Sequence, residues 1–178
     1  MQIQTIEIPS FTRIETQAPS SRIREISDFA NRNSLLIRKI TDGKNILLLV
    51  DEKNTGDIGK DRLLKLFEFY EQIRDKIVDN CYDIAGLFGE TNLAPTGSHI
   101  ESKHGALHFT GFENHCCNYI YLPDNTVMAV DFTAGKNVDK CSGNFDILGI
   151  RAYNMDSLFQ RLDKLYGGYW NIFSPKSG

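Results

Sequence analysis

The stretch NHCCNYIYLPDNTVMAVDFTAG, residues 114–135, decides how the second half of this chain folds. Its first part alternates in hydrophobicity as a strand does, a Pro-Asp-Asn turn follows, and a second apolar run ends at Asp131. Two antiparallel strands joined by a tight turn bring their outer ends together. We therefore expect the hairpin to place the imidazole of His115 beside the carboxylate of Asp131, a pairing found in catalytic triads.

Periodic patterns predict further elements on both sides of this hairpin. Apolar residues at helical spacing predict helices, and alternation or a short apolar run predicts strands. The expected helices cover residues 20–32, 61–78, 81–88 and 155–166, and the expected strands cover residues 3–8, 35–40, 46–50, 106–109 and 144–150, with a polar loop over 89–105. This order of elements predicts an α+β fold in which helices pack against an antiparallel sheet.

Length and composition indicate one ordinary globular domain. The chain has 178 residues, 41% hydrophobic and 24% charged, with a net charge of −3. We expect a single domain over 1–178, with a strand, a helix and a hairpin in residues 1–60 and the remaining elements in residues 61–178. The weak charge gives no reason to expect nucleic-acid binding, and no apolar run approaches the roughly 18 residues of a membrane span. The first residues, MQIQTIEIPSF, do not resemble a signal peptide.

The four cysteines are expected to be free thiols. No C-x-x-C pair occurs, and the adjacent Cys116 and Cys117 have a poor spacing for zinc. Cys116 and Cys117 are expected to face opposite sides of one strand, and Cys141 is expected to be unbonded and dispensable. A metal site built from histidines is a low-ranked alternative, and its members would be His99, His104, His108 and His115.

Cys81 is the best candidate for a nucleophile. It lies at the predicted start of a short apolar helix, where Asp79 or Asn80 can act as the cap. The dipoles at a helix N-terminus lower the pKa of a cysteine and favour its thiolate. The backbone N–H of Cys81 and the Asn80 side chain are candidate oxyanion donors, whereas Gln72 on the preceding helix is a doubtful one. The alternative interpretation is structural, with Cys81 a buried hydrophobic residue, His115 a solvated side chain and Asp131 a turn residue.

The order Cys81, His115, Asp131 along the chain resembles the order of the catalytic residues in the papain-fold and transglutaminase-like superfamily of cysteine enzymes. The segments NCYDIA, H-x-x-N at 115–118 and VDFT at 130–133 resemble the family's helix start and its His-Asp hairpin. The resemblance implies a papain-like core over roughly residues 79–133, with Cys81 as nucleophile, His115 as general base and acid, and Asp131 orienting the imidazole. Cys117 departs from the pattern, since many transglutaminase-like members carry an aromatic residue there.

The resemblance implies a hydrolase or acyl transferase that acts through a thioester on a protein substrate. Protease, glutamine deamidase and transglutaminase activities remain open, because the sequence does not show which amide is attacked or whether water or an amine accepts the acyl group. Small bacterial toxins and effectors of similar size make a host protein one candidate substrate. By this analogy residues 61–178 form the catalytic core, and residues 1–60 recognise the protein partner or cover the site. The expected location is cytoplasmic, or a host cell reached by a route that needs no signal peptide. No cofactor is expected. The rival hypothesis is a non-enzymatic binding module on the same fold, with Cys81 buried and inert.

Overall fold

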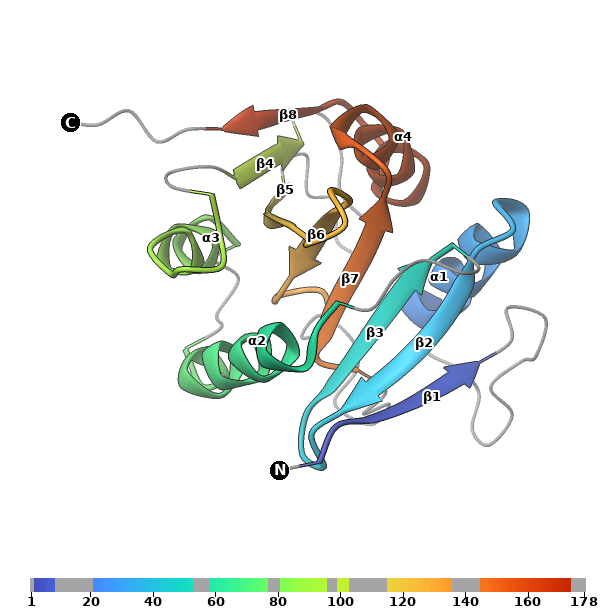
Figure 1. Cartoon of the computed structure of the whole chain (residues 1–178). Helices are drawn as coiled ribbons and strands as arrows, with labels where there is room; N and C mark the ends of the chain where they lie inside the picture. The colour runs from blue at the N-terminus through green and yellow to red at the C-terminus, as the bar shows by residue number, and fades with distance from the viewer. Residues whose placement is uncertain are drawn as a thin grey trace.

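An open sheet of eight strands runs through the computed structural model of the chain, in the order β1-β2-β3-β7-β6-β5-β4-β8 (Figure 1). The structure describes residues 2–8, 21–52, 58–76, 81–95, 99–102, 115–135 and 145–173. The strands are Gln4–Ile8 (β1), Leu36–Thr41 (β2), Ile46–Asp51 (β3), His99–Ser102 (β4), His115–Tyr121 (β5), Val127–Asp131 (β6), Ile147–Ala152 (β7) and Trp170–Phe173 (β8). The helices are Ser21–Arg32 (α1), Lys60–Ile73 (α2), Cys81–Gly89 (α3) and Met155–Tyr166 (α4). The α+β class predicted from the sequence is confirmed.

The sheet is mixed rather than wholly antiparallel, which corrects the sequence prediction. Neighbouring strands pair antiparallel except β3 and β7, which run parallel. The predicted hairpin of β2 and β3 is present, and its second strand joins β7 near the middle of the sheet. As a result, the strands of the first 60 residues extend the same sheet as the strands of the second half.

Helices cover both faces of this sheet, with α1 and α4 on one side and α2 and α3 on the other (Figure 1). Each side has its own apolar core, one around Phe29 and Leu158 and the other around Phe67 and Phe88. Strands covered on both faces must be apolar at successive positions instead of alternating. This is why every residue of β6 and β7 is buried.

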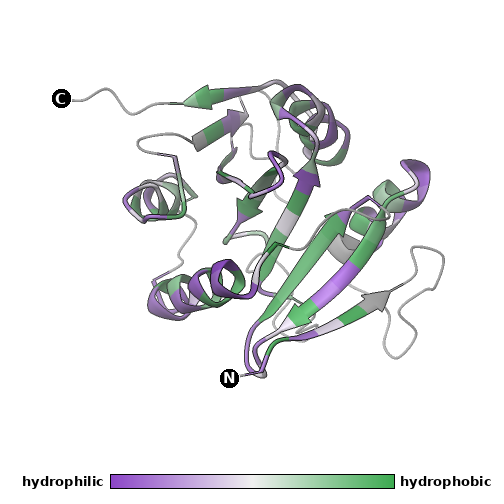
Figure 2. Ribbon diagram, viewed as in Figure 1, coloured by the Kyte–Doolittle hydropathy of each residue, from purple (hydrophilic) through white to green (hydrophobic). Residues whose placement is uncertain are grey.

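The helices are amphipathic, whereas β3 is hydrophobic over most of its length (Figure 2). Helix α2 ends at Ile73, earlier than the predicted residue 78, and residues 77–80 lie outside the described part of the chain. Its buried face includes Leu66, Phe67 and Phe69, while Leu64 and Tyr70 are only partly buried. These buried side chains are the face that the helix presents to the sheet.

Two short strands, β4 and β8, occur where the sequence predicted none. Strand β4 falls inside the predicted loop of residues 89–105, and it pairs antiparallel with both β5 and β8. The strand predicted near 106–109 falls outside the described residues. Four residues are too few to carry a clear alternating pattern. Such short strands can therefore be identified only from the strands that pair with them.

Helix α4 has well-defined ends that fix the position of its last residue. The Asn154 side chain accepts a hydrogen bond from the Ser157 backbone N–H at 2.8 Å, which caps the first turn. Gly167 ends the helix with a φ of 82°, a conformation that glycine adopts readily. The helix therefore stops at Tyr166, as predicted.

None of the helices in the described ranges combines the length and the apolar character that a membrane crossing requires.

Candidate active site

His115 and Asp131 are in direct contact at one end of the sheet. The Nε2 atom of His115 lies 2.7 Å from Oδ2 of Asp131. In the β5–β6 pairing, Asn118 is opposite Val130 and Tyr119 is opposite Ala129. Continuing this register places Asp131 one diagonal step from His115, within reach of a long side chain on the same face. The contact expected from residues 114–135 is therefore present.

The carboxylate of Asp131 is held at both of its oxygens, although the residue is only 3% exposed. Oδ1 accepts from the backbone N–H and the hydroxyl of Thr133, both at 2.9 Å. Oδ2 accepts from His115 and from the Tyr166 hydroxyl, which lies at 2.7 Å. Burial favours the neutral acid, but the charge of His115 and these hydrogen bonds hold the pKa of Asp131 well below its usual range. Asp131 is therefore an anion at neutral pH and can only accept hydrogen bonds.

His115 is correspondingly stabilised as a cation. Burial alone would lower its pKa, but the charge of Asp131 and the hydrogen bond to it act in the opposite direction. A side-chain hydrogen bond with Cys81 and the charge of that thiol add to this effect, and the pKa of His115 rises to about 10. Because Nε2 donates to Asp131, Nδ1 is the ring nitrogen left to face Cys81.

Cys81 is the first residue of α3, as the sequence predicted, and its side chain is partly exposed. Helix α3 packs on β5, and the buried side chain of Asn118 donates from Nδ2 to the Ala85 carbonyl at 2.8 Å. Asn118 is the asparagine of the H-x-x-N segment, and it ties the helix that begins at Cys81 to the strand that begins at His115. Cys81 and His115 each open their own element, which brings a thiol and an imidazole together at one end of the sheet.

Two aromatic side chains that the sequence interpretation missed enclose His115. The Tyr166 ring stacks on the imidazole, with ring centres 5.3 Å apart and planes 24° apart. The Trp170 ring meets it edge-on, with centres 6.1 Å apart. Ser102 of β4 is opposite His115 in one strand pairing and opposite Trp170 in the other, so the register of β4 brings these two residues to the same part of the sheet. The wall beside the histidine is thus aromatic, although Cys117 is small.

The other described cysteines have a different environment from Cys81. Cys116 and Cys117 are buried free thiols. Burial, together with the negative charges of nearby groups that include Cys81 and Asp131, raises the pKa of both thiols. They are therefore protonated at neutral pH and poor nucleophiles. Cys141 lies outside the described residues.

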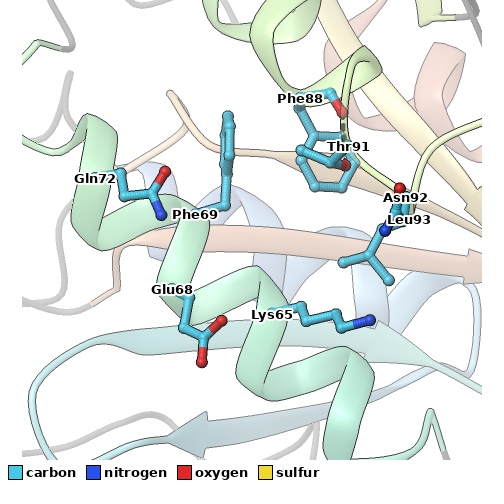
Figure 3. Close-up of a pocket in the computed structure, with 8 residues that line it drawn as sticks. All are labelled: Lys65, Glu68, Phe69, Gln72, Phe88, Thr91, Asn92 and Leu93. Carbon is cyan, nitrogen blue, oxygen red and sulfur yellow. Dashed lines mark hydrogen bonds between the residues drawn. The ribbon is translucent and has the colours of Figure 1, made fainter.

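The candidate oxyanion donors differ in whether the structure describes them and in where they lie. Asn80 and the cap candidate Asp79 lie outside the described residues, so the role of Asn80 stays a prediction. Gln72 lines a cavity of about 310 Å³ between α2 and the end of α3, beside Phe69 and Phe88 (Figure 3). Phe88 lies seven positions after Cys81 on α3, which is roughly 10 Å along the helix axis at 1.5 Å per residue. Gln72 therefore faces a separate cavity at the far end of α3.

Among the described residues, no three or more His, Cys, Asp or Glu side chains are arranged to hold a metal ion. Two of the four histidines in the alternative metal site, His104 and His108, lie outside those residues.

The sequence contains only a weak signal for the aromatic partners of His115. Trp170 lies in YWNIF directly after Gly167-Gly168, and an aromatic-rich run after a glycine pair is typical of a strand. Tyr166 is indistinguishable by pattern from the other apolar residues of its helix. Thr133 lies within the VDFT segment, where a threonine two residues after an aspartate commonly bonds to it.

No family model matches the chain, and no solved structure matches it.

Proposed function

We propose that this chain is a cysteine-dependent amide hydrolase or acyl transferase of papain-like or transglutaminase-like type, with Cys81, His115 and Asp131 as its triad. The observation that carries this proposal is the 2.7 Å contact between His115 Nε2 and an ionised Asp131, where the Cys81 thiol also helps to raise the pKa of the same imidazole. A thiolate beside an imidazolium is the reactive state of cysteine hydrolases.

The chemistry follows from these positions. The Cys81 sulfur attacks the carbonyl carbon of an amide, and the imidazolium of His115 gives its proton to the departing nitrogen as the C–N bond breaks. The product is a thioester on Cys81 and a free amine. A water molecule then attacks the thioester, His115 takes its proton, and the acid is released with the thiolate restored. An amine in place of water would complete a transamidation instead.

The helix that begins at Cys81 offers a site for the negative oxygen of the intermediate. Backbone N–H groups in the first turn of a helix have no partner within the helix and carry partial positive charge. The Cys81 N–H is the candidate donor from the described residues, and the Asn80 side chain is the second candidate. The substrate expected is a protein, and a bacterial effector acting on a host protein is the proposed setting. Residues 1–60 are proposed to contribute to substrate recognition.

A binding module with an inert, buried Cys81 is the alternative, and the partial exposure of this thiol argues against it. Alkylation separates the two functions. We expect iodoacetamide at pH 6 to label native protein once, at Cys81, since an ordinary thiol with a pKa near 8.5 is almost unreactive there. Cys81→Ala abolishes this label, and Cys141→Ser leaves it intact. Alkylation of Cys81 only at the rate of a free thiol would contradict the enzyme proposal.

The substrate is then sought by comparing a cell lysate treated with the wild-type protein and with Cys81→Ala. New protein termini indicate a protease, a mass increase of one unit at glutamine indicates a deamidase, and new isopeptide links indicate a transglutaminase.

A further inference from the structure

Tyr166 contacts both members of the His115–Asp131 pair from outside the segment that contains them. It is the last residue of α4 and is only 2% exposed. Its hydroxyl donates to Oδ2 of Asp131 at 2.7 Å, the same oxygen that His115 uses. Its ring also lies against the imidazole at 5.3 Å. A single side chain therefore touches the carboxylate with its polar end and the imidazole with its face.

These contacts leave Asp131 no freedom to turn. An ionised carboxylate has about four lone-pair sites, two on each oxygen. Thr133 supplies both donors to Oδ1, and His115 with Tyr166 supplies both donors to Oδ2. Without the Tyr166 hydroxyl, the Oδ2 atom of Asp131 would be held by His115 alone. The carboxylate and the imidazole could then move together as a hydrogen-bonded pair.

The stacked ring restricts the second degree of freedom, the rotation of the imidazole about its χ2 bond. Tyr166 covers one face of His115, and Trp170 meets the same ring at an interplanar angle of 83°. The ring plane is thus fixed while Nε2 stays directed at Asp131. With Nε2 occupied by Asp131, Nδ1 is the ring nitrogen left for Cys81.

We propose that Tyr166 is a positioning residue that holds the His115 imidazole in the orientation from which it activates Cys81. The inference rests on the function proposed above. The hydroxyl fixes the oxygen that His115 bonds, and the ring fixes the plane of the imidazole. Two variants separate these contributions, since Tyr166→Phe removes only the hydroxyl and Tyr166→Leu removes the ring as well.

The test measures the second-order rate of Cys81 alkylation by iodoacetamide in the full-length protein from pH 5 to pH 9, beside a thermal melt. We expect Tyr166→Phe to react about tenfold more slowly than wild type at pH 6, the effect of losing one hydrogen bond to a charged group. We also expect its rate profile to shift to higher pH. Tyr166→Leu should slow the alkylation of Cys81 further.

Tyr119→Phe is the matched control. Tyr119 lies on β5 in the same apolar core as Tyr166 and is similarly buried, at 4% exposure. This variant also removes one hydroxyl from a buried tyrosine, but it should keep the wild-type rate profile.

The outcomes distinguish this inference from the proposed function. Fast alkylation of wild type at pH 6 with the same profile in Tyr166→Phe overturns the positioning role and leaves the enzyme proposal standing. A wild-type Cys81 that reacts only as a free thiol overturns both. Equal slowing in Tyr166→Phe and Tyr119→Phe also overturns the role, since the effect would then be general to the core. If Tyr166→Leu fails to fold, Tyr166→Phe decides the matter by itself.

Discussion

At the scale of single residues, the three members of the proposed triad differ in how much activity their substitution should remove. Cys81→Ala removes the sulfur that forms the thioester, so turnover should fall to background. His115→Ala removes both the base and the leaving-group acid, and its loss should be nearly as large. Asp131→Asn should lose less than the roughly 10⁴-fold of a serine triad, because a thiolate–imidazolium pair depends less on its third member. A substrate assay beside a thermal melt measures each variant, and full turnover in Cys81→Ala would end the proposal.

His115 also predicts a pH dependence of stability. Its pKa is raised in the folded state from 6.5 to about 10, so it binds its proton more tightly when folded. The stability it contributes is complete below about pH 6.5 and disappears as pH rises through 10. Relative to His115→Gln, the wild-type protein should lose free energy of unfolding between pH 7 and pH 10. Parallel stability curves for the two proteins over this range, in urea melts, would contradict the ion pair with Asp131.

At the scale of elements, the critical junction is the one between α3 and β5. The Asn118 amide donates to the Ala85 carbonyl inside the core, and this bond sets where α3 lies along the strand. We expect Asn118→Ala to cost about 1–3 kcal/mol of stability and to slow alkylation of Cys81 at pH 6, because the helix that begins at Cys81 loses its anchor.

Asn33→Ala is the matched control for this prediction. The Asn33 side chain likewise donates to a helix carbonyl, that of Phe29, at 2.8 Å, but on α1 rather than at the site. It should lose stability without slowing the alkylation of Cys81. If both variants keep the wild-type alkylation rate, Asn118 stabilises the fold and does not place Cys81.

At the scale of the whole molecule, a buried arginine connects parts of the chain that are distant in sequence. Arg151 of β7 is fully buried, and its Nη2 lies 2.5 Å from Asp124 in the β5–β6 turn. Its Nε donates to Thr126 at 2.9 Å, and Nη1 lies 3.6 Å from Asp51 at the end of β3. Removing Arg151 takes a positive charge away from Asp51 in a low-dielectric interior, although Arg38 still pairs with that carboxylate at 2.5 Å and Asp124 is 39% exposed.

Arg151→Met should therefore destabilise the protein by about 3 kcal/mol in denaturant unfolding, the lower end of the cost of breaking a buried ion pair. Lys44→Met, which breaks the exposed ion pair with Glu71, should cost at most about 1 kcal/mol. A loss for Arg151→Met as small as that of Lys44→Met would show that the buried network contributes little to the fold.

Local patterns in the sequence were enough to predict the central hairpin, the start of α3 and the contact between His115 and Asp131. The alternation in residues 114–135 specified the hairpin, and its geometry brought His115 to Asp131. The apolar run after Cys81 specified a helix that begins there. These predictions succeeded because hydrophobic periodicity and turn residues act over a few neighbouring positions, and a hairpin relates its two ends through its own turn.

How these elements meet depends on long-range packing instead. The parallel pairing of β3 with β7 joins segments about 100 residues apart, and nothing local distinguishes it from an antiparallel alternative. Strand β4 pairs with β5, and β8 pairs with β4, so Trp170 on β8 meets His115 across β4. Tyr166 looks like any core residue of α4, yet its hydroxyl ends on Asp131, 35 residues earlier in the chain. Such contacts depend on the packing of whole layers, because a side chain's partner across a core is set by where its helix rests and not by its own neighbours in sequence.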